Sequence, residues 1–249
     1  MTYGICNLSI VPLRAEPSHK SEMVSQILFG EHFECLEKGK KWCLVRLAFD
    51  NYEGWIDAKQ YAELTEGNFQ LLNKSEHSFV TDLVEFATDE NSNLVPIHLG
   101  SDLTGIHFFG HKFEGNRTKG KKSRTNLAQT AFLYLNSPYL WGGKTPFGID
   151  CSGLVQMVYK LNGFQLLRDA SQQAQQGEPL SFIEESQPGD LAFFDNSEGE
   201  IIHVGIILKN NYIIHSHGKV RIDRLDHSGI FNNETNRYSH NLRVIKKVI

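Results

Sequence analysis

The chain has 249 residues, which is enough for one catalytic domain and one or two small modules. Hydrophobic residues make up 40% and charged residues 22%, as in ordinary soluble globular proteins. The formal net charge of −4 does not suggest a nucleic-acid-binding protein, which needs a basic face, and no apolar run approaches the roughly 18 residues of a membrane span. The basic cluster of residues 112–124 is interpreted as a solvated loop, because glycines interrupt it and no aromatic residues interleave. We therefore expect neither nucleic acid nor a membrane as a partner.

The N-terminal segment Met1–Leu8 has no basic region followed by a long apolar stretch, so it does not resemble a signal peptide. We expect a cytoplasmic protein; a chain whose leader had been removed would look the same and would be periplasmic or secreted. Four cysteines are present without CxxC pairs or metal-ligand spacing. We expect no metal and no cofactor, and a monomer.

Residues 1–62 contain short apolar runs separated by frequent turns. Residues 32–36 and 42–49 are expected to form a hairpin around the turn Lys38-Gly39-Lys40. Many short strands with frequent turns are typical of a small β-barrel.

Residues 63–124 are expected to form a second, diverged barrel of the same kind. Residues 80–87, 92–99 and 104–109 are its predicted strands, and polar clusters between them form the turns.

Residues 125–249 differ in character from the rest. Apolar spacing predicts a helix over 126–135 and a second helix from Cys151, ended by Asn162-Gly163. Three apolar runs then predict strands, at residues 190–194, 203–208 and 212–216. Helices followed by an antiparallel sheet indicate an α+β domain.

Cys151 follows a glycine-rich segment and begins the second helix. The positive end of a helix lowers the pKa of a cysteine, and unpaired backbone N–H groups of the first turn can bind a developing oxyanion. The neighbouring carboxylate of Asp150 opposes thiolate formation, so a histidine partner is needed. The position favours a nucleophile over a buried structural cysteine.

His203 begins a strongly apolar strand, which would hold its imidazole rigidly enough to act as a general base. A three-residue turn, Lys209-Asn210-Asn211, would pair residue 203 with residue 217 and make residue 215 the diagonal neighbour. Either His215 or His217 could then orient His203, and periodicity alone does not choose between them.

Four ordered motifs resemble the NlpC/P60 family of papain-like cysteine peptidases, over about residues 125–249. They are "YLWGGKTPFGIDCSGLVQMVY", "LLRDASQQ", "QPGDLAFF" and "HVGIIL". The resemblance implies Cys151 as nucleophile, His203 as base and His215, twelve residues beyond the base, as the third catalytic residue. It also implies that Tyr139 lies beside the nucleophile and helps to bind the oxyanion.

The N-terminal pieces "PLR", "SQILFGE", "KWCLVRL" and "GWI" resemble a bacterial SH3-like (SH3b) domain. The expected fold is thus a papain-like α+β catalytic domain (125–249) preceded by small SH3-like β-barrel domains (1–62 and 63–124). This combination is similar to the γ-D-glutamyl-L-diamino acid endopeptidases of muropeptide recycling.

That second resemblance implies a small peptide substrate, L-Ala-γ-D-Glu-diamino acid, with a free N-terminal amine. The catalytic-domain residues that it assigns to the substrate pocket are Asp150, Ser152, Ser171 and Trp141. From the first SH3-like domain it assigns Tyr52 and Glu22, with Glu16 as the rival of Glu22. A cationic amine is bound best by nearby carboxylates, so the Asp150 carboxylate would serve to bind the amine of the substrate.

Two other functions are compatible with parts of the sequence. The SH3-like segments could tether the protein to intact peptidoglycan as a wall-binding module, with catalysis secondary. The histidines could serve a metal hydrolase, but no HExxH motif and no suitably spaced acidic ligand is present.

Overall fold

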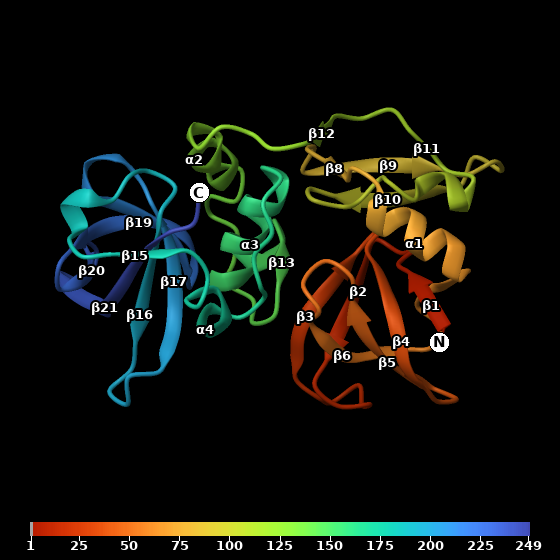
Figure 1. Ribbon diagram of the computed structural model, residues 1–249, viewed down its shortest axis with the longest axis horizontal. Helices are drawn as coiled ribbons and strands as arrows, with labels where there is room; N and C mark the ends of the chain where they lie inside the picture. The colour runs from red at the N-terminus through yellow and green to blue at the C-terminus, as the bar shows by residue number, and fades with distance from the viewer. Residues whose placement is uncertain (1) are drawn as a thin grey trace. The chain divides into compact units, whose positions relative to one another are not determined.

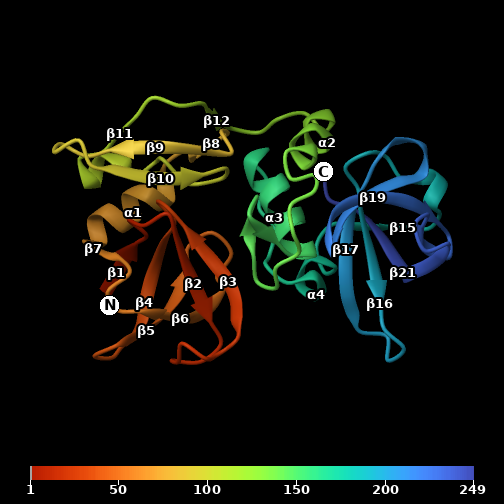
Figure 2. The same ribbon diagram turned by 180° about the vertical axis from the view of Figure 1, so that it is seen from behind.

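The computed structural model describes residues 2–249, and the chain divides into two compact units, Met1–Lys121 and Lys122–Ile249 (Figure 1; Figure 2 gives the view from behind). Each unit has its own sheets and its own hydrophobic core. Within residues 2–249, no helix is long and apolar enough to cross a bilayer.

The first unit is built on a seven-stranded sheet in the order β3-β2-β6-β5-β4-β1-β7. Its strands are β1 (Thr2–Ile5), β2 (Ile10–Arg14), β3 (Met23–Leu28), β4 (His32–Lys38), β5 (Trp42–Leu47), β6 (Glu53–Asp57) and β7 (Ala62–Leu64). Alternate side chains of β5 are buried, which is the period-two pattern of a sheet with one face on a core. Leu13, Ile27 and Phe33 lie in that core. The predicted SH3-like barrel is confirmed.

The rest of the first unit contains one helix and two small sheets. Its elements are α1 (Glu66–Lys74), β8 (Ser78–Val80), β9 (Val84–Thr88), β10 (Leu94–His98), η1 (Ile106–Phe109), β11 (Lys112–Phe113) and β12 (Arg117–Lys119). The prediction of a strand over 104–109 was wrong: Gly105 and Gly110 flank a 3₁₀ turn there, with Gly110 in the left-handed conformation. A second SH3-like domain over 63–124 stays a prediction.

The second unit contains a seven-stranded antiparallel sheet in the order β15-β21-β16-β17-β18-β19-β20. The strands are β15 (Glu178–Leu180), β16 (Leu191–Asp195), β17 (Ile201–Ile207), β18 (Tyr212–His217), β19 (Lys219–Asp226), β20 (Gly229–Asn232) and β21 (Arg237–Lys247). Because β20 also pairs with β21, six of these strands close on themselves. The predicted α+β class is confirmed.

The remaining elements of the second unit are α2 (Thr125–Phe132), β13 (Lys144–Thr145), β14 (Gly148–Ile149), α3 (Cys151–Leu161), α4 (Ala170–Gln173), η2 (Ile183–Glu185) and η3 (Lys209–Asn211). Both views show α2, α3 and α4 gathered on one side of the sheet (Figures 1 and 2). Every residue of α3 is buried, and the helix packs on β17 and β18. This packing, more than helix propensity, stabilises an eleven-residue helix.

The hairpin of β17 and β18 has the register that the sequence predicted. Gly205 lies opposite His215, and the backbone N–H of Leu208 donates to the carbonyl of Tyr212 at 2.7 Å. Asn210 and Asn211, both in the left-handed region, turn the chain between the strands. His215 is therefore the diagonal neighbour of His203 on the same face of the sheet.

Candidate active site

Cys151 is the first residue of α3, and the preceding Asp150 caps the helix by accepting the backbone N–H of Gly153 at 2.6 Å. The loop before it approaches the helix closely: a Cβ on Gly153 would lie 2.3 Å from the carbonyl oxygen of Gly143. A hydrogen bond from the Ser216 hydroxyl to the Ile149 carbonyl, 2.8 Å long, ties this loop to β18. The nucleophile is thus fixed against the strand that carries His215.

Burial is the main influence on the Cys151 thiol and, with the charge of Asp150, raises its pKa to about 12. The backbone N–H groups of Val204 and Ser152 and the charge of Arg168 act in the opposite direction but do not outweigh it. Desolvation is thus the larger effect at this helix start, and it adds to the opposition to thiolate formation that the sequence predicted from Asp150. The resting thiol is protonated and needs a base.

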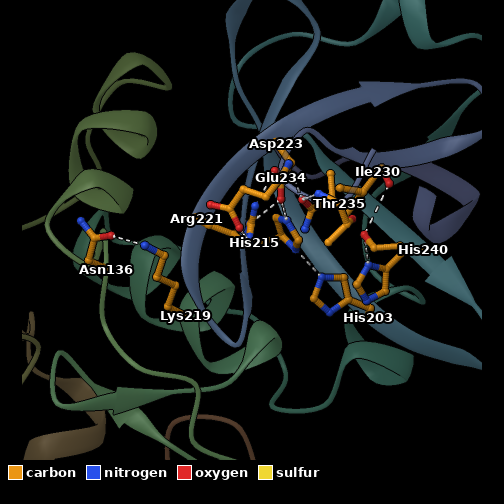
Figure 3. A network of polar contacts seen from close by, with 12 residues as sticks. Asn136, His203, His215, Lys219, Arg221, Asp223, Ile230, Glu234, Thr235 and His240 are labelled. Carbon is orange, nitrogen blue, oxygen red and sulfur yellow. Dashed lines mark hydrogen bonds and ion pairs between the residues drawn. The ribbon is translucent and has the colours of Figure 1, made fainter. Parts of the chain in front are cut away.

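The base and its partners form a hydrogen-bonded relay (Figure 3). Nε2 of His203 lies 2.8 Å from Nδ1 of His215, and Nε2 of His215 lies 3.0 Å from Oδ2 of Asp223. His203 and His215 are 5% and 0% exposed. Of the two histidines that the register left open, His215 is the one that contacts His203 in this relay, whereas His217, at the end of β18, is exposed.

The Asp223 carboxylate fixes the tautomer of both imidazoles. A carboxylate only accepts, so His215 carries its proton on Nε2 and presents the Nδ1 lone pair to His203. His203 must then donate from Nε2, which leaves its Nδ1 as the nitrogen that can accept the proton of Cys151. The order of protons along the relay therefore creates the general base.

Arg221 anchors the outer end of the relay. Its Nε donates to Oδ2 of Asp223 at 2.7 Å and its Nη2 to Oδ1 at 3.1 Å. Burial alone would raise the pKa of Asp223, but the hydrogen bonds from His215 and Arg221 outweigh burial and the pKa lies below its usual value. Asp223 thus stays ionised and keeps its orienting role.

Burial lowers the pKa of His203 well below its usual value, and positive charge on the neighbouring histidines would lower it further. A neutral imidazole beside a neutral thiol is the favoured resting pair. A neutral imidazole of this kind can take the proton of a thiol during attack on a carbonyl and return it to a leaving amine, which is the role predicted for His203.

Asp150 is held by a buried arginine that sequence reasoning did not assign to the site. Arg168, 1% exposed, donates from Nη1 to Oδ1 at 3.1 Å and from Nη2 to Oδ2 at 2.7 Å. The backbone N–H of Gly142 adds a further bond to Oδ2 at 2.8 Å. Asp150 is therefore charge-matched inside the protein, and a substrate amine would have to share its oxygens with Arg168.

The other predicted residues of the catalytic domain differ in how far they are exposed. Ser152 is buried and accepts from Nη1 of Arg168 at 2.9 Å, whereas Ser171 is exposed on α4. Tyr139 and Trp141 are 37% and 59% exposed. Burial, and then the charges of Cys151 and Asp150, raise the pKa of Tyr139 to about 12. Tyr139 therefore keeps its hydroxyl proton and can donate to an oxyanion.

Three predicted substrate residues belong to the first unit, separate from the unit that carries Cys151. Tyr52 is half-buried and packs on the barrel core, and Glu22 and Glu16 are exposed. The backbone carbonyl of Glu22 accepts from the N–H of Ala15 at 3.0 Å, which brings the two rival glutamates onto the same turn. Their part in substrate binding stays a prediction.

Sequence reasoning missed Asp223, Arg168 and His240. A signal for Asp223 was present: the glycine turn at Gly218 pairs His215 with Arg221 and makes Asp223 the diagonal neighbour of His215. Arg168 stands in the quoted motif "LLRDASQQ", but no short-range spacing in the sequence predicts that it pairs with Asp150. His240 comes from β21, far along the chain.

A protonated cysteine at a helix start, with a histidine base oriented by a relay, defines a thiol hydrolase. Residues 136–238 match the family model described as NlpC/P60 family, and residues 13–60 match the one described as bacterial dipeptidyl-peptidase Sh3 domain. The chain belongs to the NlpC/P60 family and is a cysteine peptidase.

Two curated relatives align over most of the chain. Dipeptidyl-peptidase 6 of Lysinibacillus sphaericus is 30% identical, over 86% of this chain and 88% of the relative. Gamma-D-glutamyl-L-lysine dipeptidyl-peptidase of Bacillus subtilis (strain 168) is 39% identical, over 77% of this chain and 71% of the relative. The crystal structure of an NlpC/P60 family protein from Bacillus cereus ATCC 10987 matches with a TM-score of 0.81 at 18% identity, covering 99% of each chain, and supports the fold.

Replacing Asp223 with asparagine should lower kcat by at least about tenfold, because an amide can present its NH₂ group to His215 and invert both tautomers. The measurement is steady-state hydrolysis with circular dichroism as a check on folding. Asp195→Asn is the matched control: Asp195 pairs with Arg243 at 3.6 Å, and among the described residues no hydrogen bond or ion pair joins it to the relay. Equal rates for Asp223→Asn and the unmodified protein would contradict the relay.

Alkylation of Cys151 by iodoacetamide should speed up about tenfold per pH unit between roughly pH 6 and pH 9, because below the raised pKa each unit multiplies the thiolate fraction by ten. Peptide mapping by mass spectrometry separates Cys151 from the other cysteines, and a small-molecule thiol serves as the reference. A rate that is flat across this range would indicate a preformed thiolate–imidazolium pair instead.

Proposed function

We propose that the protein hydrolyses the bond between γ-D-Glu and the diamino acid in cell-wall muropeptides that carry a free N-terminal L-Ala, in the recycling of murein peptides. The observation that carries the proposal is the alignment, over 77% of this chain, with a relative named for a γ-D-glutamyl-L-lysine dipeptidyl-peptidase activity. That alignment accompanies a catalytic relay of the kind that such hydrolysis needs.

A dipeptidyl-peptidase releases a dipeptide from the N-terminus, so it must measure the distance from the free amine to the cut bond. Asp150 immediately precedes the nucleophile in sequence and caps its helix. An ammonium group bound near Asp150 and Ser152 would therefore lie a short way from Cys151. This geometry favours a small peptide over an intact polymer, whose chain continues past that point.

The charge balance at Asp150 indicates that this one carboxylate is not sufficient to bind the ammonium group of the substrate. Because Arg168 matches the charge of Asp150, an incoming ammonium gains little net attraction from that pair. A second carboxylate is needed, and the resemblance to the γ-D-glutamyl-L-diamino acid endopeptidases assigns that role to Glu22, with Glu16 as its rival. The same resemblance assigns Tyr52 to substrate binding.

The exposed aromatic side chains near the nucleophile would form the walls of the pocket. Trp141 is 59% exposed and adjoins Gly142, whose N–H binds Asp150. An indole offers a large apolar surface to the methyl group and backbone of an L-Ala residue. The hydroxyl of Tyr139 would bind the oxyanion formed at the γ-D-Glu carbonyl.

L-Ala-γ-D-Glu-L-Lys and L-Ala-γ-D-Glu-diaminopimelate should both be tested, each beside its N-acetylated form. We expect release of the dipeptide L-Ala-D-Glu from a free-amine peptide, and at least about tenfold lower kcat/KM for its acetylated form, because acetylation removes a charge-assisted hydrogen bond. Chromatography of the products gives the rates. Equal cleavage of free and acetylated peptides would refute the requirement for a free amine.

A further inference from the structure

His240, which the catalytic relay does not use, lies against the catalytic base (Figure 3). It comes from β21, and its ring stacks on that of His203 with 4.0 Å between centroids and 17° between planes. Nitrogen atoms of His203, His215 and His240, one from each ring, all lie within 4.8 Å of one another. Three imidazoles therefore converge at one place, from three different strands.

We propose that His203, His215 and His240 form a binding site for Zn²⁺, and that the bound metal reversibly inhibits the peptidase. Imidazole nitrogen is a preferred ligand of Zn²⁺, and three protein ligands plus one water complete its tetrahedral shell. The site thus joins two residues of the catalytic relay to one residue outside it.

In two of the three histidines, a hydrogen bond to the nitrogen that faces away from the proposed metal fixes the tautomer of the ring. Nε2 of His215 donates to Asp223, which leaves Nδ1 with a lone pair. Nδ1 of His240 lies 2.9 Å from the Ser239 hydroxyl, which itself donates to the Ile230 carbonyl at 3.4 Å. The Ser239 oxygen therefore accepts from Nδ1 of His240, and Nε2 of His240 carries a lone pair. A metal-bound histidine usually donates its other N–H to an oxygen acceptor such as a carboxylate, as His215 does here to Asp223.

The pKa values are consistent with this arrangement. Burial, and then positive charge on His215 and His217, lower the pKa of His240 to about 4, and burial also lowers the pKa of His215. All three rings are therefore neutral near pH 7, which is the form that binds a metal.

Metal binding requires two local movements. The 2.8 Å between Nε2 of His203 and Nδ1 of His215 must open to about 3.4 Å, the separation of two ligands in a tetrahedral zinc site. A metal lies in the plane of each ligand ring, so the ring of His240 must also turn out of its stack on His203. His240 is only partly buried, and this leaves room for a change of rotamer.

Inhibition follows from where the metal places the proton of His203. In the relay, Nε2 carries the proton and Nδ1 accepts the proton of Cys151. A metal bound at Nε2 requires a lone pair on that nitrogen, so the single proton of the neutral ring moves from Nε2 to Nδ1. The imidazole then has no lone pair for the thiol, and general-base catalysis stops until the metal leaves.

The binding test uses the Cys151→Ala protein, which removes the competing thiol, and titrates it with zinc chloride in a calorimeter. We expect one Zn²⁺ per chain, with affinity at least about tenfold weaker after the additional change His240→Asn. His227→Asn is the matched control, since His227 is an exposed histidine of the same unit. Equal affinity in the His240→Asn protein, or no binding without Cys151, would overturn the proposal.

A second test of binding uses absorption spectroscopy and needs no histidine variant. Its result therefore does not depend on whether the His240→Asn protein folds. Co²⁺ added to the Cys151→Ala protein should give the strong visible absorption of a tetrahedral site with nitrogen and oxygen ligands. The weak absorption of an octahedral, hydrated ion would overturn the proposal. Neither arm uses a substrate, so both remain valid if the proposed muropeptide specificity is wrong.

The inhibition test compares rates with and without Zn²⁺, each variant relative to its own metal-free rate. The concentration that halves the rate should rise at least about tenfold in His240→Asn, and EDTA should restore activity. Equal inhibition of both proteins would mean that the metal acts elsewhere, for example on the thiolate of Cys151, and would refute the role of His240.

Discussion

The hydrogen-bonded chain from Asp223 through His215 to His203 is the constraint on which the site depends. It is built by repeating one geometric step across three adjacent antiparallel strands. His215 is the diagonal neighbour of His203 across β17 and β18, and Asp223 is the diagonal neighbour of His215 across β18 and β19. The register of two hairpins therefore sets the tautomer of the base, and a one-residue slip in either would break the chain.

Two buried carboxylates of the site are each paired with an arginine. Arg168 matches Asp150 beside the nucleophile, and Arg221 matches Asp223 at the outer end of the relay. Each pair satisfies its carboxylate with two hydrogen bonds from one guanidinium, the geometry in which a buried pair is best supported. The catalytic proton therefore moves between Cys151 and His203, two groups whose neutral forms burial favours.

Local patterns in the sequence predicted the parts of the fold that depend on local signals. Glycine and asparagine turns between apolar runs gave the β17–β18 register, and the spacing after Cys151 gave a helix that ends before Asn162. The residues that were missed come together through long-range packing: Arg168 with Asp150, and His240 with His203. The charge of Asp150 beside Cys151 can be read from the sequence, but the larger effect of burial on the Cys151 pKa cannot, because no spacing reports how completely the helix start is buried.

The protonation of the His203 and His215 rings can be measured directly by nitrogen-15 NMR of the histidine side chains near neutral pH. The assigned spectra should show His203 and His215 both neutral and both protonated on Nε2, with Nδ1 of each ring in the chemical-shift range of a lone-pair nitrogen. A His203 ring protonated on Nδ1, or on both nitrogens, would contradict the account, because it would leave no base for Cys151.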